Sequence, residues 1–393
     1  MNSLNFFFSA YTKESLPSYY KGLLNSYTQE QVFENRKGER FQLPASSFVV
    51  EDIPSYFTVT KDELPKTMGC YSIKQYPGFL INFENVKSLP DYLNERFGKT
   101  SRYKLRREQK KLEQCFNIRY EMYFGAIDKS EYDFIMNEFY RLLELRSLEK
   151  GIKHNINLAT QNFYRANVYQ MILDRKASFY VIYNGKTPID ICLNFHMKNV
   201  IFQYIRTYNI DYSKFNTGYT DLMKQIEWCI TNKIKFITFS KGDFYWKRRW
   251  CNTVYDYHHE IFFLKKSFAG RLKATSYYLL KALKQYVREK GLIEKYHAYR
   301  TKQNNSKNTA EDSHRIKYNK IPFNTEIKNT ESIDYKSMKF NFLRRTIYDF
   351  LYESDENESE ITVYAILDTS KSYLVIGKKS KAMLSYTSNS SSF

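Results

Sequence analysis

The most informative stretch for chemistry runs from residue 205 to residue 250. A predicted strand ends near Tyr208, a loop leads to Asn216-Thr217-Gly218, and a helical pattern follows. A glycine at a strand-to-helix junction lets backbone N–H groups at the start of the helix face an anion, and the helix dipole favours negative charge there. The stretch predicts a binding site for a pyrophosphate group. The alternative is an ordinary loop in which Thr217 caps the helix.

A second loop of this stretch, residues 240–250, interleaves aromatic and basic side chains. Lys247, Arg248 and Arg249 stand between Trp246 and Trp250. Such a pattern is typical of a loop that faces phosphate groups, and it also fits a surface that binds nucleic acid. We favour the phosphate-facing loop.

The two loops together resemble the CelD/BcsL-like acetyltransferase family of the GNAT superfamily, and the resemblance covers roughly residues 90–290. Three departures from the family pattern stand at Thr238–Ser240, at Trp246 and at Arg146-Ser147, and they bear on substrate specificity more than on the fold. The matching positions are Tyr204, Tyr208, Tyr212, Gly218, Leu222, Phe239, Gly242, Asp243, Lys247 and Trp250.

The resemblance implies acyl transfer from acetyl-CoA or another acyl-CoA to an amine, with the thioester between splayed strands. Lys247 is then a candidate for stabilising the oxyanion, and Tyr208 or Tyr212 for protonating the departing thiolate. Asp243 is one candidate base; Asp190, His196 and Asp211 are the others, and we interpret His196 as structural. The predicted CoA-binding residues are Asn216, Thr217, Gly218, Tyr219 and Trp250.

A basic run from Lys99 to Lys111 carries seven basic side chains against Glu108. We expect Arg102, Arg106 and Arg107 to lie at a cleft between two halves and to bind an anionic acceptor or cofactor. The alternative is a solvated helix face.

The order of predicted elements indicates a mixed α/β protein with mostly antiparallel sheets flanked by helices, in a tandem GNAT-like arrangement similar to that of the Fem-type aminoacyltransferases. Strand signals dominate up to about residue 88, and a helix over 89–115 shows a break at Gly98. Three strands between 178 and 208 make an antiparallel meander. We predict a degenerate GNAT-like half over 1–125, an acyltransferase domain over 126–300, a linker over 301–335 and a small extension over 336–393.

Composition narrows the class of protein. The 393 residues are 42% hydrophobic and carry a net charge of +19, which favours an acidic partner such as a phosphorylated cofactor, nucleic acid or an anionic membrane. The five scattered cysteines form no zinc-ligand spacing, so we expect neither a metal nor disulfides. No signal peptide or membrane-spanning stretch is evident, and we expect a cytoplasmic protein.

Three functions remain open at this stage. The first is an acyl-CoA-dependent N-acyltransferase, with an amino sugar of surface polysaccharide biosynthesis as the family-level acceptor. The second is a Fem-type transferase that uses aminoacyl-tRNA, and the third is a catalytically silent scaffold. An intact CoA-binding site would distinguish them.

Overall fold

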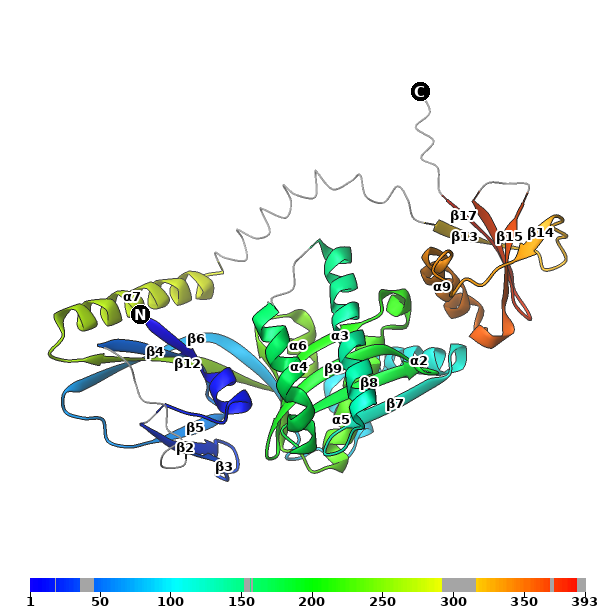
Figure 1. The fold of residues 1–393 in the computed structure, drawn as a ribbon. Helices are drawn as coiled ribbons and strands as arrows, with labels where there is room; N and C mark the ends of the chain where they lie inside the picture. Colours follow the sequence, from blue (N-terminus) through cyan, green and yellow to red (C-terminus); the bar gives the residue numbers. More distant parts are fainter. Residues whose placement is uncertain are drawn as a thin grey trace.

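The structure is a computed structural model and describes residues 1–17, 19–35, 46–151, 156, 158–291, 316–367 and 371–386. Its strands form sheets of nine, five and three strands (Figure 1). Among the described strands, only the pairs β1–β4 and β10–β11 are parallel. The predicted mixed α/β fold with mostly antiparallel sheets flanked by helices is therefore confirmed.

The middle of the chain forms one end of the nine-stranded sheet, in the order β11-β10-β9-β8-β7. Alternate residues of β8 face opposite sides: Phe179 packs in the core with α3 and α4, and Tyr180 packs in the core with α2. Helix α5 covers the α2 side. The bounds are α1 Leu89–Arg96, α2 Lys99–Cys115, β7 Ile118–Tyr123, α3 Lys129–Lys150, α4 Leu158–Leu173, β8 Ala177–Asn184, β9 Thr187–Met197, β10 Val200–Tyr208, η2 Ile210–Phe215, α5 Thr217–Thr231, β11 Phe236–Lys241 and α6 Tyr245–Trp250.

Local sequence explains several of these boundaries. The Ser88 side chain accepts a hydrogen bond from the Asp91 N–H at the start of α1, and Gly98 lies between α1 and α2, where the break was predicted. Gly151 ends α3 in the left-handed conformation with a φ of 60°. The helical pattern predicted after Asn216-Thr217-Gly218 is α5, which begins at Thr217, and its N-cap is Asn216 rather than Thr217.

The other end of the nine-stranded sheet has the order β1-β4-β12-β6. Three of these strands come from the first 82 residues, and β12 comes from much later in the chain. Strand β12 lies between β4 and β6, and α7 packs across all three. A small sheet of β3, β2 and β5 and the π-helix η1 complete this part. The bounds are β1 Asn2–Asn5, η1 Phe8–Thr12, β2 Tyr20–Asn25, β3 Gln31–Glu34, β4 Ser47–Pro54, β5 Phe57–Lys61, β6 Met68–Asn82, β12 Thr253–Leu264 and α7 Phe268–Glu289.

The C-terminal module is a five-stranded sheet with one helix, and it packs on the central part through α9. The ring of Tyr348 lies 4.7 Å from that of Tyr212 and 4.8 Å from that of Phe116. Its elements are β13 Ile316–Ile321, β14 Thr330–Ser332, η4 Asn341–Leu343, α9 Arg344–Ser354, η5 Glu358–Glu360, β15 Thr362–Ile366, β16 Ser372–Ile376 and β17 Lys381–Tyr386.

The sheet pairings bear on the predicted division of the chain. The linker prediction over 301–335 is wrong for residues 316–321, because these form β13 and pair with β17; residues 301–315 lie outside the described part. The predicted boundary at residue 125 does not coincide with a break in the sheet, because β7 before it pairs with β8 after it. Two domains meeting near this residue stay a prediction.

Candidate functional site: a fork between two strands

Strands β10 and β11 pair in parallel over only three residues and then separate. The last paired residues are Phe202 and Thr238, and an irregularity between Gln203 and Ile205 follows in the pairing of β10 with β9. A cavity of about 460 Å³ opens at this fork. Its lining residues are Arg146, Gln203, Tyr204, Arg206, Tyr208, Ser213, Asn216, Thr217, Gly218, Tyr219, Asp221, Leu222, Phe239 and Trp246.

The turn before α5 forms one wall of this cavity. Asn216 has a φ of 50°, and Asn216, Thr217, Gly218 and Tyr219 all line the opening. The first N–H groups of a helix have no partner within the helix, so this end of α5 can accept an anion. The structure thus brings four of the five predicted CoA-binding residues to one cavity.

Gly218 has no side chain, and this leaves room for the guanidinium group of Arg206 to pack against it. A Cβ at this position would lie 2.1 Å from Nη1 of Arg206. The guanidinium group therefore lies directly on the first turn of α5 and adds a full positive charge to the anion-attracting end of the helix.

Two buried carboxyl groups, those of Asp190 and Asp221, interact electrostatically with Arg206. The Asp190 Oδ2 atom lies 3.6 Å from Arg206 Nη1, and Asp221 is also buried. Burial raises the pKa of Asp190 to about 6 against the opposing charge of Arg206. Burial, reinforced by the neighbouring Asp190, raises the pKa of Asp221 well above its usual value. One guanidinium group thus provides the positive charge beside two carboxyl groups that are buried away from water.

Arg146 supplies a second positive charge at the cavity. Its Nη1 atom donates to the Arg206 carbonyl oxygen at 2.9 Å. The guanidinium carbons of Arg146 and Arg206 lie 4.8 and 5.2 Å from the centre of the Tyr208 ring. Tyr208 lines the cavity, and its ring lies beside both cations near the start of α5.

Lys247 and Asp243 do not line the cavity. The buried Lys247 ammonium group donates to the carbonyl oxygens of Ser240 and Lys241 at 3.1 and 3.0 Å, and burial lowers its pKa to about 8. Asp243 accepts a hydrogen bond from Arg248 Nε at 2.6 Å. The structure therefore places Lys247 beneath the end of β11 and Asp243 in a surface ion pair.

Two further predicted residues belong to cores. The Tyr212 hydroxyl accepts a hydrogen bond from Asn184 Nδ2 at 3.0 Å, and burial raises its pKa to about 12. Trp250 is buried, with its ring 4.7 Å from that of Phe97. Both side chains position elements around the cavity without lining it.

The basic run lies on helix α2, which packs against α5, η2 and α9. This helix carries Arg102, Arg106 and Arg107. Arg102 donates to the Phe97 carbonyl oxygen at 2.5 Å, and Arg107 pairs with Glu108 at 2.9 Å. A role for this run in binding an anion stays a prediction.

The other three candidate bases, His196, Asp211 and Asp190, lie in different surroundings. His196 is buried 2.7 Å from the Ser178 hydroxyl, and burial lowers its pKa to about 3. This geometry agrees with its interpretation as structural. Asp211 faces Arg344 of the C-terminal module at 3.7 Å. Asp190 alone of these three is tied to the cavity, through Arg206.

A second cavity of about 210 Å³ adjoins the first, because Tyr204 lines both. It is mainly aromatic and also exposes Asp52 and Lys241. The sequence interpretation missed it, since it joins the N-terminal segment to β4, β10, β11 and β12. Its lining residues are Asn5, Phe6, Phe7, Phe8, Tyr11, Asp52, Pro54, Tyr56, Phe202, Tyr204, Ser240, Lys241 and Tyr257.

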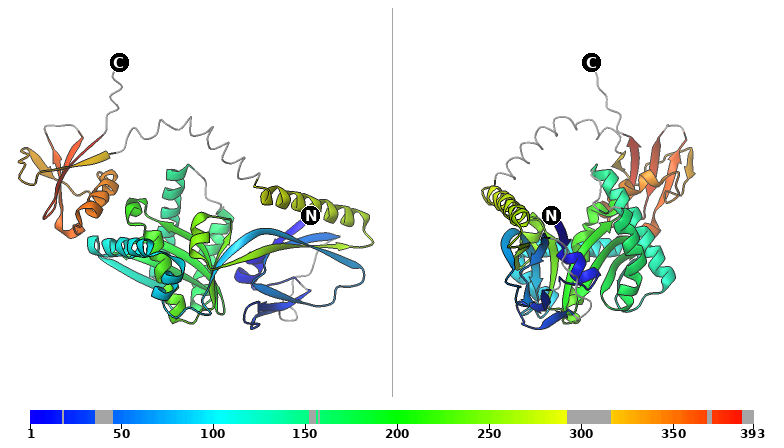
Figure 2. Two further views of the ribbon diagram at one scale, coloured as in Figure 1. Left: turned by 180° about the vertical axis from the view of Figure 1, so that it is seen from behind. Right: turned by 60° about the vertical axis from the view of Figure 1, so that its left-hand side comes forward.

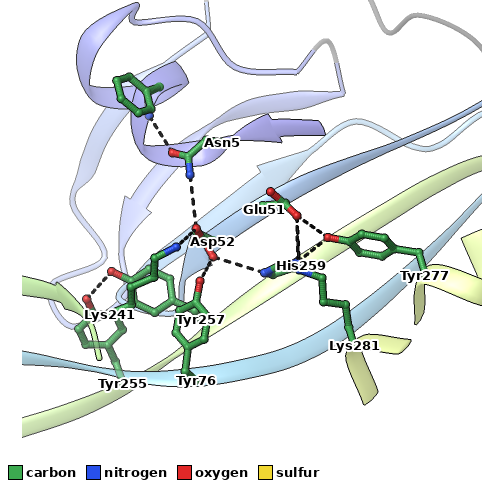
Figure 3. A network of polar contacts seen from close by, with 11 residues as sticks. Asn5, Glu51, Asp52, Tyr76, Lys241, Tyr255, Tyr257, His259, Tyr277 and Lys281 are labelled. Atoms are coloured by element: carbon green, nitrogen blue, oxygen red, sulfur yellow. Dashed lines mark hydrogen bonds and ion pairs between the residues drawn. The ribbon is translucent and has the colours of Figure 1, made fainter. Parts of the chain in front are cut away.

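Asp52 is the centre of a polar network at this second cavity (Figure 3). Its Oδ2 atom lies 2.9 Å from Lys241 Nζ, and its Oδ1 atom lies 3.3 Å from His259 Nε2 and accepts a hydrogen bond from Tyr76. Burial acts to raise the pKa of Asp52, but the bonds from His259, Tyr76 and Lys241 outweigh burial and hold the pKa well below its usual value. With a φ of 63°, Asp52 adopts a conformation that costs energy for a non-glycine residue.

Comparison with known proteins agrees with this geometry. Residues 99–248 match the model of the acetyltransferase (GNAT) domain. This match covers less than half of the chain and supports a GNAT-type fold for the matched segment. The matched segment runs from α2 into α6 and includes the fork and the start of α5; the narrower CelD/BcsL-like assignment stays a prediction. Comparison with curated proteins gives no match.

Three solved structures are similar over part of their length. A conserved protein of unknown function from Bacteroides thetaiotaomicron is 8% identical over 56% of this chain and 70% of its own, with a TM-score of 0.37. The C-terminal domain of a putative lysylphosphatidylglycerol synthetase from Agrobacterium fabrum is 8% identical over 60% of this chain and 71% of its own, with a TM-score of 0.37. FemX is 10% identical over 49% of this chain and 63% of its own, with a TM-score of 0.35.

Within the described ranges, no three His, Cys, Asp or Glu side chains are grouped to hold a metal ion. In the same part of the chain, no helix has the length and apolar character needed to cross a membrane. All five cysteines are described and are free thiols.

Proposed function

We propose that the chain is an acyl-CoA-dependent N-acyltransferase that binds its donor in the fork between β10 and β11. The observation that carries the proposal is the coincidence, in one cavity, of the start of α5 with the two cations Arg146 and Arg206. A pyrophosphate group needs N–H donors and positive charge together, and this wall of the cavity supplies both. The GNAT match over the same residues supports the donor class.

The chemistry asks little of the protein beyond positioning. The amine nitrogen attacks the thioester carbonyl, the C–N bond forms, the C–S bond breaks, and one proton passes from nitrogen to the leaving sulfur. Tyr208 lines the cavity and is our candidate for delivering that proton. For Lys247 we propose a positioning role, since its ammonium group holds the end of β11, while a direct role on the oxyanion remains the alternative.

We place the acceptor in the second cavity, because Tyr204 separates it from the donor cavity by a single side chain. Aromatic rings with a few fixed polar groups are a common lining for small-molecule sites. Asp52 stays ionised among its donors and can accept hydrogen bonds from hydroxyl or amino groups of a polar acceptor. An amino sugar fits this lining, and an acyl-CoA donor would place the reaction in the cytoplasm.

Aminoacyl-tRNA is the second candidate donor, and the net charge of +19 favours it. The two donors differ in size and charge, so binding separates them directly.

Calorimetric titration with acetyl-CoA, CoA and aminoacyl-tRNA tests the proposal, alongside the variants Arg146→Ala and Arg206→Ala. Arg141→Ala is the matched control, because Arg141 lies on α3 with Arg146 but pairs at the surface with Glu138 at 2.7 Å. We expect acetyl-CoA to bind the wild type and the control and to bind each cavity variant at least about tenfold more weakly, since a hydrogen bond to a charged group contributes about 1.5–3 kcal/mol. Binding of tRNA alone would support the second candidate, and binding of neither would support a silent scaffold.

A further inference from the structure

Helix α7 is fixed on the sheet by one face. Gly270 and Ala274 are buried, and a Cβ on Gly270 would lie 2.7 Å from the Ser46 carbonyl oxygen. Tyr277 lies 3.2 Å from His259 Nδ1 and donates to Glu51, which Lys281 faces at 3.5 Å (Figure 3). These contacts determine the rotation of the helix about its axis and therefore which residues point away from the protein.

The opposite face of α7 is an exposed apolar stripe. Spacings of four, seven, four and three residues place its members on one side of a helix. The helix lies along the outside of β4, β6 and β12, and both views of Figure 2 show it at the edge of the molecule. The members of the stripe are 57–75% exposed: Phe268, Leu272, Leu279, Leu283 and Tyr286.

Basic side chains border this stripe. Between Lys265 and Lys290, Glu289 is the single acidic residue. Exposed apolar surface rimmed by positive charge is typical of helices that lie in the interface of an anionic bilayer. The exposed basic residues are Lys265, Lys266, Arg271, Lys273, Lys284 and Lys290.

We propose that α7 binds an anionic membrane surface, with the apolar stripe among the lipid headgroups and the basic border against lipid phosphates. The charge decides between this occupant and a second copy of the chain, because a two-fold contact through the stripe would bring two basic borders together. The helix would lie in the plane of the interface, and its 22 residues would extend about 33 Å along it. The proposal is independent of the reaction proposed above.

Vesicle sedimentation with the full chain tests this inference. One set of vesicles is phosphatidylcholine alone, and the other contains phosphatidylglycerol as well. We expect at least tenfold stronger binding to the anionic vesicles, weakened by salt. The variant Leu279→Ser/Leu283→Ser should lose at least tenfold of that binding, and Lys273→Gln/Lys284→Gln should reduce both the binding and its salt dependence.

Leu148→Ser/Leu158→Ser is the matched control, because these leucines of α3 and α4 are at least as exposed as those of the stripe. It should bind as the wild type does. All the substituted side chains are exposed, so thermal midpoints should stay close to that of the wild type and exclude misfolding as the cause. Equal binding to both kinds of vesicle, or unchanged binding by the leucine variant of α7, overturns the proposal. A concentration-dependent dimer that this variant abolishes also overturns it, in favour of self-association.

Discussion

Replacement of Arg206 should destabilise the protein through the carboxyl groups it leaves behind. In Arg206→Ala, Asp190 and Asp221 stay buried without the guanidinium group that lies 3.6 Å from Asp190. Breaking a buried ion pair by removing one partner costs about 3–5 kcal/mol. Because the Arg206 side chain keeps 24% of its surface exposed, we expect the lower end, about 3 kcal/mol. For a unit of about 150–250 residues this corresponds to a thermal midpoint lower by about 6–12 °C.

The double variant Arg206→Ala/Asp190→Asn tests the cause of that loss. Replacing the carboxylate removes most of the uncompensated charge, so about 1–2 kcal/mol should return. Acetyl-CoA binding should not return, because the cation at the start of α5 is still missing. Chemical denaturation and calorimetric titration measure the two effects separately. An Arg206→Ala protein as stable as the wild type, or a double variant no more stable than the single one, would refute the assignment of Arg206 as counter-charge.

Three further variants test neighbouring parts of the site. Burial raises the pKa of Asp190 from 3.8 to about 6, so between these pH values the folded chain keeps a proton that the unfolded chain releases. The urea midpoint of the wild type should therefore fall relative to that of Asp190→Asn as the pH rises from about 4 to about 6. Parallel curves for the two proteins would contradict the raised pKa. Gly218→Ala should weaken acetyl-CoA binding about tenfold by displacing the Arg206 guanidinium group, and unchanged affinity in a titration would show that this packing is irrelevant to the donor. Lys247→Met should cost about 1–3 kcal/mol by leaving two carbonyl groups without their donor but should keep acetyl-CoA affinity, whereas a large loss of turnover at unchanged stability would favour the oxyanion role.

The local part of this fold could be predicted from the sequence. Strands β8, β9 and β10 are joined by short turns and pair with their neighbours in the chain, so alternation and the Asn184-Gly185 turn suffice to predict them. The turn at Gly218 that leads into α5 also follows from a local pattern. Helix α6 was missed, because six residues rich in tryptophan and arginine show no helical period.

The long-range part could not be predicted in the same way. Asp52 meets Lys241 and His259 only because β4, β11 and β12 share one sheet, and no periodicity indicates pairings between residues so far apart in the chain. The role of Arg206 was hidden for a related reason. A single arginine in a strand has no pattern, and its importance follows from two carboxylates and a glycine that approach it from β9 and α5.

The position of β12 between β4 and β6 determines when the first part of the protein can fold during synthesis. Residues 47–82 leave the ribosome well before Thr253–Leu264, the strand that must join them. At about 5–20 residues per second, roughly nine to thirty-six seconds pass with the facing edges of β4 and β6 open in the nascent chain. Open strand edges invite pairing with other chains. Production of this protein should therefore depend on chaperones that bind early, and fragments that stop before β12 should aggregate.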